Sequence, residues 1–575
     1  MKNEKDGGEA IVEALRRLSI DYIICCPGSE WAPVWEALHQ QKVNERTGPK
    51  YLQCWHEMLA LNIATGYTLI TGKGQAVLLH AGSGVLQGAL GLNSATRGEV
   101  PMIVMSGESV TLGKDPKLTM EMQWYAGVSV GGADRLVAPL VKHTIRVQSP
   151  HTLHGSVLRA GQIASRIPKG PVYLDVPLEW MLHGWTPESV SALPATPKTR
   201  AMPEDIGRLA NAILKSKNPI IVADNIGVDR GSYRGLSELA EALAIPVIGG
   251  GSANYANFAQ NNSLWIGVES YEYLEKADLI ILIGGRTPWN PPSRPPSAAP
   301  IIVIHDHPLK SWLVYQELHA SEYIEGDIGE NLNSLTRAVR DIGFPQVDID
   351  LRRKKWATVH EFQIQKLQAA CDVARSNNAL NIYSMCSQVA ELLPLNSIFV
   401  DETVTHSKAL RQCLPLNDFQ AYFRNPGGGL GQGLGIALGI KLAAAERPVI
   451  LFVGDGSFLF NPIIQGLGAA RDFSLPIIIV VLNNEGYASM GNSKRHFYPD
   501  SAGVRAGSEF GVKVLNPQFE RLGESLGFTG ACVETYSEFN EALSKGCIEI
   551  EAGRTFIINA MLSALPSPSP YRNNN

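Results

Sequence analysis

Short runs of apolar residues recur along this chain, and segments long enough for one helix separate them. Residues 279–283 and 477–482 hold no polar side chain at all. Unbroken runs of this kind are typical of strands covered on both faces, as in parallel sheets. Residues 11–18, by contrast, carry apolar side chains at helical spacing. The pattern predicts an α/β protein with mainly parallel sheets. The predicted strands cover residues 22–26, 75–80, 100–105, 171–177, 219–223, 245–248, 279–283, 300–304, 397–400, 447–453 and 477–482.

Composition changes along the chain suggest three doubly wound α/β domains. Residues 186–203 are rich in proline, serine and threonine, as linkers are. We therefore predict an N-terminal domain over residues 1–185, a central domain over 204–365 and a C-terminal domain over 366–565. The tail, residues 566–575, is too polar and proline-rich to pack and is expected to be disordered.

Overall composition narrows the class of protein. The chain has 575 residues, of which 45% are hydrophobic and 18% charged, enough for several buried cores. The net charge is −5 and no basic stripe is present, so nucleic acid is not an expected partner. No 18-residue apolar run or secretory leader is found, so no membrane partner is expected. Eight cysteines without a CxxC motif fit a reducing, cytoplasmic location.

Two polar turns follow two of the predicted strands. Asp455 lies between Gly454 and Gly456 after the first strand, and Asn484 follows the second. Because parallel strands end at the same sheet edge, Asp455, Asn484 and the carbonyl of Gly486 are expected to converge. Such oxygens suit Mg²⁺, which usually takes phosphate oxygens as well, so the pattern predicts a bound diphosphate. The alternative is that both motifs are ordinary tight turns.

A second glycine cluster, residues 425–435, precedes a predicted helix. Glycines let backbone approach a flat ring closely, and Leu430 is the bulky residue among them. The alternative is a glycine-rich loop that merely precedes the helix. A dinucleotide fingerprint is a weak match, because no apolar strand comes before the loop.

The stretch from residue 454 to residue 487 resembles the signature of thiamine diphosphate enzymes, in the branch of acetolactate synthase, benzoylformate decarboxylase and pyruvate decarboxylase. The resemblance covers nearly the whole chain and implies thiamine diphosphate and Mg²⁺ as cofactors. By this resemblance Asp455, Asn484 and the Gly486 carbonyl bind the metal, although the interval between the first two is slightly longer than usual. Leu430 would bend the cofactor, and the Gly428 carbonyl would accept from its pyrimidine amino group.

Glu57 opens a predicted helix and is the candidate for activating the cofactor. A glutamate there can simply favour the helix dipole. In the family, however, the matching glutamate hydrogen-bonds the pyrimidine N1′ and promotes the imino tautomer that removes the C2 proton. Family precedent places Glu57 and Asp455 on different subunits. The resemblance therefore implies at least a homodimer, and a homotetramer is common among relatives.

The substrate end carries mixed signals. Ser29 is a candidate for gripping a substrate carboxylate, although it also suits a turn. His80 is a candidate for relaying protons. Benzoylformate decarboxylase is similar at both positions, whereas acetolactate synthases usually carry glycine in place of His80. Residues 121–124 and Lys142 are instead similar to the synthase branch. The remaining residues predicted to contact the cofactor are Glu402, Thr403, Thr405, Gly454, Gly456, Ser457 and Tyr487. Tyr487 and Met490 are also expected to line the entrance to the substrate site.

The resemblance implies a decarboxylase or carboligase that acts on a 2-oxo acid through an enamine, with a benzoylformate decarboxylase-like site. An acetolactate synthase-like carboligase and a lyase that cleaves an acyloin or diketone are the alternatives. An inactive, cofactor-binding homologue and a nicotinamide dehydrogenase are hypotheses of other classes. Some synthases of this branch bind FAD in the central domain, and that question stays open at the level of sequence.

Overall fold

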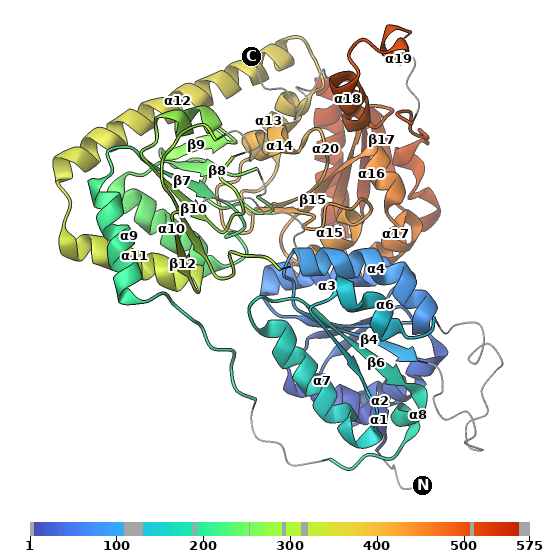
Figure 1. Ribbon diagram of the computed structural model, residues 1–575. Coiled ribbons are helices and arrows are strands. Elements are labelled where there is room, and N and C mark those ends of the chain that lie inside the picture. Colours follow the sequence, from blue (N-terminus) through green and yellow to red (C-terminus); the bar gives the residue numbers. More distant parts are fainter. Residues whose placement is uncertain are drawn as a thin grey trace. The chain divides into compact units, whose positions relative to one another are not determined.

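A computed structural model describes residues 5–108, 130–187, 193–251, 253–289, 295–311, 320–506 and 511–562. It contains three six-stranded sheets whose strands pair in parallel, with helices packed on them (Figure 1). The predicted α/β class with three mainly parallel sheets is confirmed. The burial of the strands explains the apolar runs, because every residue of a strand such as Leu279–Ile283 is buried.

The first sheet has the strand order β2-β1-β3-β4-β6-β5. Its strands are β1 (Tyr22–Cys25), β2 (Lys50–Gln53), β3 (Gln75–Leu79), β4 (Met102–Glu108), β5 (His143–Arg146) and β6 (Pro171–Pro177). The helices between them are α1 (Gly7–Arg17), α2 (Ala32–Val43), α3 (Glu57–Thr71), α4 (Ala81–Arg97), α6 (Ala133–Val137), α7 (Pro150–Ser165) and α8 (Leu178–Leu182), with a 3₁₀ turn, η1 (Ser29–Trp31).

The second sheet has the order β12-β11-β10-β7-β8-β9, which is that of a Rossmann fold. Its strands are β7 (Pro219–Ala223), β8 (Val247–Gly249), β9 (Trp265–Val268), β10 (Leu279–Ile283), β11 (Ile301–His305) and β12 (Glu322–Glu325). Its helices are α9 (Pro203–Lys215), α10 (Arg230–Leu243), α11 (Ile328–Ile342) and the 31-residue α12 (Gln346–Ser376). The proposed domain boundary between residues 365 and 366 lies inside α12.

The third sheet has the order β14-β13-β15-β16-β18-β17. Its strands are β13 (Ile398–Glu402), β14 (Tyr422–Arg424), β15 (Val449–Gly454), β16 (Ile478–Asn483), β17 (Thr529–Val533) and β18 (Phe556–Met561). The helices are α13 (Ile382–Leu392), α14 (Ser407–Cys413), α15 (Gly433–Ala443), α16 (Asp455–Phe460), α17 (Ile463–Asp472), α18 (Ala488–Phe497), α19 (Ala502–Arg505) and α20 (Tyr536–Glu551). The predicted tail, residues 566–575, lies outside the described residues.

Proline explains where several strands begin. Strands β4, β8 and β15 start directly after Pro101, Pro246 and Pro448, two residues later than the apolar runs suggested. Proline has no N–H to donate to a neighbouring strand, so it is found at strand starts rather than inside central strands. All eleven predicted strands are present, some starting slightly later than predicted. The apolar runs did not predict β2, β5, β9, β12, β14, β17 and β18.

The chain forms two compact units that do not follow the order of the sequence. The first unit combines the first sheet with α15 and α17, although both helices follow strands of the third sheet in the chain. The second unit contains the second sheet and the strands of the third sheet. No local pattern in the sequence indicates that α15 and α17 belong to the same compact unit as the first sheet.

Glycines form the tight contact between α3 and α15 in the first unit. A Cβ added at Gly439 would lie 2.1 Å from the Ile63 carbonyl oxygen, and one added at Gly66 would lie 2.1 Å from that of Ile436. Real Cβ atoms are not found at such distances from backbone, and backbone cannot rotate out of the way as a side chain can. Each helix therefore packs directly on the other through its glycine.

We expect Gly439→Ala to destabilise the first unit by about 1–3 kcal/mol, because the added methyl overpacks this contact. Differential scanning fluorimetry should show a midpoint several degrees lower. Gly155→Ala is the matched control, since a Cβ at this exposed position of α7 meets nothing within 4 Å and replaces glycine in a helix. A midpoint for Gly439→Ala at or above that of the wild type would contradict the packing described.

Candidate active site

The first unit places an acid–histidine pair at the carboxyl ends of β1 and β3. His80 Nδ1 lies 3.0 Å from both carboxylate oxygens of Glu30, and the Ala81 N–H donates to Glu30 Oε1 at 2.8 Å. The Glu30 side chain is fully buried, whereas that of His80 is 29% exposed. The hydrogen bond to Glu30 raises the pKa of His80, although burial opposes the effect. Glu30 thus favours a charged imidazole that is open to a ligand.

Two glycines make room for Glu30. A Cβ at Gly28 would lie 2.2 Å from Glu30 Oε2, and one at Gly107 would lie 2.0 Å from its Cγ. The carboxylate is therefore fixed by backbone on two sides. Sequence reasoning assigned no role to Glu30, although it directly follows Ser29. Ser29 itself is exposed at the first position of η1.

Glu57 lies next to this pair at the first position of α3, as predicted. A Cβ at Gly84 would lie 2.7 Å from Glu57 Oε1 and 3.1 Å from His80 Cβ, so the two predicted catalytic side chains are neighbours. The Cys26 thiol hydrogen-bonds with Glu57, and burial together with this carboxylate raises the pKa of the thiol. Cys26 therefore stays a neutral hydrogen-bond donor to Glu57.

Glu30→Gln is expected to lower the pKa of His80, because the neutral amide no longer stabilises the imidazolium. A raised pKa of His80 in the folded protein increases the free energy of unfolding. This contribution is fully present below the pKa of histidine in the unfolded chain and is lost as the pH rises through the pKa of the folded protein. The variant should therefore lose more stability at pH 5.5 than at pH 8.5, by about 1–3 kcal/mol at the lower pH. Histidine hydrogen–deuterium exchange measured by mass spectrometry reports the pKa directly. Glu36→Gln, an exposed change on α2, should leave both quantities unaltered.

The second unit brings the predicted metal ligands together at the carboxyl ends of β15 and β16. The Gly486 N–H lies 2.9 Å from Asp455 Oδ2 and 3.2 Å from Asn484 Oδ1. Asp455 Oδ1 also accepts from the Gly456 N–H at 2.7 Å. Burial raises the pKa of Asp455 even though these backbone N–H groups lower it. A cation beside this buried carboxylate would offset the cost of its burial.

These groups fit Mg²⁺ by their chemistry. One carboxylate, one amide oxygen and one carbonyl are hard oxygen ligands, and Mg²⁺ in proteins commonly completes its shell with phosphate and water. Across the described ranges no group of three or more His, Cys, Asp or Glu side chains is arranged to hold a metal. A magnesium here would therefore depend on a ligand such as a diphosphate.

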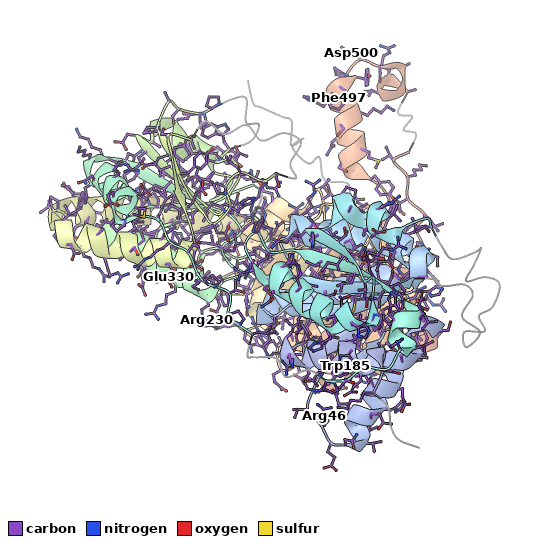
Figure 2. All side chains as sticks on the ribbon, turned by 60° about the horizontal axis from the view of Figure 1, so that its bottom comes forward. Arg46, Trp185, Arg230, Glu330, Phe497 and Asp500 are labelled. Atoms are coloured by element: carbon purple, nitrogen blue, oxygen red, sulfur yellow. The ribbon has the colours of Figure 1, made fainter. Side chains whose placement is uncertain are left out.

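The glycine turn beside Asp455 is closely packed against Tyr487. A Cβ at Gly456 would lie 2.3 Å from the Tyr487 ring, so this position requires glycine. The Tyr487 N–H donates to the Val512 carbonyl at 2.7 Å, which fixes the start of α18. Gly454 and Ser457 flank the same turn. Further along α18, Met490 and Phe497 are 53% and 62% exposed, and Figure 2 shows Phe497 at the far end of this helix.

The residues after β13 that were predicted to bind the cofactor differ in their burial and hydrogen bonding. Thr403 donates its hydroxyl and its N–H to Asp401 Oδ1, both at 2.7 Å. The second oxygen of Asp401 accepts from the Tyr422 hydroxyl at 2.6 Å. The Thr403 hydroxyl proton is thus engaged inside the protein. Glu402 is buried and Thr405 is half-buried nearby. Asp401 accepts hydrogen bonds from Thr403 and Tyr422. Like Glu30, it holds neighbouring side chains in place and was given no role in the sequence analysis.

The glycine loop belongs to the first unit and is held against α4. Asn425 Oδ1 accepts from Ser94 Oγ at 3.1 Å and from the Gly427 N–H at 2.9 Å. Gly428 has a φ of +69°, a conformation that other residues rarely adopt. Its side of the loop is exposed, and Leu430 is half-buried. Glu57 and Leu430 therefore lie in the first unit, whereas Asp455, Asn484 and Gly486 lie in the second.

The Lys142 side chain is hydrogen-bonded to backbone carbonyls. Its Nζ donates to the carbonyls of Ile163 and Arg166, both at 2.6 Å, at the end of α7. Burial lowers its pKa to about 8. The ammonium is therefore engaged by backbone near the end of a helix. Residues 121–124, the other similarity to the synthases, lie outside the described residues.

In the central domain a buried carboxylate fills the position where Rossmann folds bind ligands. Asp224 follows β7 at the switch point beside β10 and is fully buried, which raises its pKa to about 7. A Cβ at Gly250 would lie 2.2 Å from Asp224 Oδ1, and one at Gly285 would lie 2.9 Å from Oδ2. The glycines here accommodate this side chain.

Three parallel α/β sheets, buried polar groups at strand ends and an acid–histidine pair are features typical of α/β enzymes. Family models match three parts of the chain: the N-terminal thiamine pyrophosphate (TPP) binding domain of thiamine pyrophosphate enzymes over residues 5–123, their central domain over 206–335 and their C-terminal TPP binding domain over 402–560. The chain belongs to the thiamine pyrophosphate enzyme family. The predicted family is thereby confirmed.

Relatives come from both predicted branches of this family. The chain is 24% identical to the acetolactate synthase large subunit of Haemophilus influenzae, over 94% of this chain and 91% of that protein. It is 26% identical to benzoylformate decarboxylase of Pseudomonas aeruginosa, over 84% and 86% respectively. The solved structure of a Rhodococcus jostii 4-hydroxybenzoylformate decarboxylase is similar with a TM-score of 0.79 and 23% identity, covering 97% of this chain and 99% of that one. The last comparison shows the shared fold.

The predicted enzyme class, a 2-oxo acid decarboxylase or an acetohydroxyacid synthase-like enzyme, agrees with these relatives. No helix among the described residues has the length and apolar character needed to cross a membrane.

Proposed function

We propose that this chain is a Mg²⁺- and thiamine diphosphate-dependent decarboxylase or carboligase of 2-oxo acids, with a site similar to that of benzoylformate decarboxylase. The observation that carries the proposal is the Glu30–His80 pair beside Glu57. Acid–base catalysis at a substrate needs a titratable group near neutral pH, and histidine supplies one.

Each residue has a defined role in the proposal. Asp455, Asn484 and the Gly486 carbonyl would hold Mg²⁺, which would supply positive charge for binding the diphosphate. Glu57 hydrogen-bonds the cofactor's pyrimidine ring, and Leu430 supports its bent form. When bound, thiamine diphosphate supplies the nucleophilic carbon and the electron sink for loss of CO₂.

His80 moves the substrate's protons. Because Glu30 raises its pKa, His80 holds a proton up to a higher pH than a free imidazole does, and in this proposal it donates that proton from Nε2 to the product carbon once CO₂ has left. Nδ1 stays on Glu30, so the ring does not turn as the proton leaves. Ser29, exposed beside Glu30, is placed to receive the substrate carboxylate in this proposal.

Carboligation is the second candidate, and the acetolactate synthase relatives favour it. Incubation with pyruvate or benzoylformate, with and without an aldehyde acceptor, separates the two activities. Release of the aldehyde alone supports decarboxylation, and a hydroxyketone product supports ligation. Cleavage of an acyloin or diketone in place of either would identify a lyase. Absence of turnover with all of these substrates would contradict the proposal and favour an inactive homologue.

The proposal includes assembly and location. Because Glu57 and the metal ligands are expected to come from different subunits, the active form is at least a homodimer, and we expect a homotetramer in the cytoplasm. Sedimentation velocity of the cofactor-loaded protein tests the assembly. A monomer with full activity would contradict a site shared between subunits.

A further inference from the structure

A cavity with a positively charged lining lies at the amino-end edge of the second sheet. Its volume is about 730 Å³. It is bounded by the end of α9, the residues that lead into β7, the turn between α11 and α12, and the first turns of α12 (Figure 1). Asp224, by contrast, lies at the carboxyl end of β7. None of the residues assigned to the proposed reaction lines the cavity.

The cavity has an excess of cations. Four basic side chains, Lys215, Lys217, Arg352 and Lys355, line it together with a single carboxylate, Asp348. Four positive charges against one negative charge leave a surplus of three. A second carboxylate nearby, on Asp278, accepts hydrogen bonds from the Lys217 and Asn218 N–H groups and the Ser216 hydroxyl, and these neutral donors leave its negative charge in place. Counting Asp278, the surplus is two positive charges.

Arg352 is held rigidly at the floor of the cavity. It is only 9% exposed, and its guanidinium donates to the carbonyls of Leu243 at 3.1 Å and Ser216 at 3.2 Å. It also lies 5.3 Å from the centre of the Phe344 ring. Carbonyl oxygens satisfy its N–H groups without cancelling its charge. Burial lowers its pKa, and the negative charges of Asp278 and Asp348 oppose that effect. Among the described residues no carboxylate lies within salt-bridge distance of it.

Lys355 experiences the resulting repulsion. Burial lowers its pKa, and the positive charges of Arg352 and Lys276 lower it further. Its Nζ donates to Asn218 Oδ1 at 2.9 Å and lies 4.3 Å from the centre of the Trp356 ring. These contacts fix the ammonium in place but leave its charge uncompensated. An anion in the cavity would relieve the repulsion between these cations.

One wall of the cavity is apolar. Leu214, Ile342, Phe344 and Leu351 line it, and Ile342 and Leu351 are 51% and 63% exposed. Exposed apolar side chains beside clustered cations are suited to a ligand with an anionic group and a carbon skeleton.

We propose that this cavity binds an organic phosphate, with the phosphate on Arg352 and the lysines and the organic group on the apolar wall. A surplus of two charges matches a dianion better than a monocarboxylate, and arginine and lysine are the usual protein partners of phosphate. The cavity is a second ligand site, distinct from the proposed cofactor site, and its existence does not depend on the proposed reaction.

Phenyl phosphate is the simplest probe that carries both features. We expect isothermal titration calorimetry of the full chain, saturated with thiamine diphosphate and Mg²⁺, to show one binding site. Phenyl phosphate should bind more tightly than inorganic phosphate or phenol, and affinity should fall with added salt. Lys217→Gln and Lys355→Gln should each weaken binding by about 2- to 5-fold, as expected for exposed charges, and the double variant by more. Leu351→Ser should reduce the preference for phenyl phosphate over inorganic phosphate.

Controls separate this site from the others. Lys354→Gln removes an exposed charge from α12 outside the cavity and should leave affinity unchanged. Saturation with thiamine diphosphate and Mg²⁺ fills the proposed diphosphate site, so phenyl phosphate cannot bind there during the titration. Lack of saturable binding at millimolar concentration, or unchanged affinity in the double lysine variant, would overturn the proposal. Equal affinity for inorganic and phenyl phosphate would overturn the role of the apolar wall.

Discussion

Glu57→Gln is expected to slow exchange of the cofactor's C2 proton by at least about 100-fold, with turnover falling equally. The carboxylate is placed at the start of α3 beside Cys26 and Gly84, where it has little freedom to move. Glutamine keeps the shape but loses the negative charge that stabilises the protonated pyrimidine ring. Quenched-flow hydrogen–deuterium exchange followed by NMR measures the C2 step directly.

Binding and catalysis should separate in this variant. Calorimetry should show thiamine diphosphate binding within about 10-fold of wild type, because the diphosphate site lies in the second unit. Glu36→Gln serves as the control for loss of a glutamate charge on the same unit. Wild-type C2 exchange in Glu57→Gln would refute the role of Glu57, whereas loss of binding alone would indicate a purely structural one.

Asp455→Asn is expected to weaken binding of thiamine diphosphate with Mg²⁺ by about 100-fold or more. The change removes the only formal charge from the proposed protein ligands, and Mg²⁺ at neutral side chains keeps its water instead. It also removes one of two carboxylate oxygens that accept backbone N–H groups from Gly456 and Gly486. Binding with and without Mg²⁺ should be measured by calorimetry.

Thermal stability gives an independent reading of the same site. A ligand that binds only the folded chain raises its stability in proportion to the logarithm of its concentration above Kd. The rise in unfolding temperature on adding cofactor and Mg²⁺ should therefore be largely lost in Asp455→Asn and kept in Asp500→Asn, an exposed control. An undiminished rise in Asp455→Asn would place the metal elsewhere.

Most central strands, and the two turns that carry the proposed metal ligands Asp455 and Asn484, were predictable from the sequence because their signals are local. A strand such as β10 is buried on both faces, so its whole run is apolar. Asp455 and Asn484 each follow such a strand, and parallel pairing of β15 with β16 brings their turns together.

Other features depend on contacts between distant residues. Glu30 becomes an orienting group only because β1 pairs with β3, which brings it to His80, fifty residues further on. Asp401 becomes an anchor only when β14 places Tyr422 beside it. A single glutamate or aspartate carries no mark of such a partner, and an alternative role as a turn or surface residue fits the sequence equally well.

The grouping of α15 with α3 has a consequence for synthesis of the chain. Almost every residue of α3 from Met58 to Leu69 is buried in the first unit, and part of its cover is α15. The ribosome delivers that cover only after roughly 360 further residues, from the end of α3 to the start of α15, which takes about 20–70 s at common elongation rates. During that interval the nascent N-terminal segment exposes an uncovered apolar helix, which makes it a natural client for chaperones.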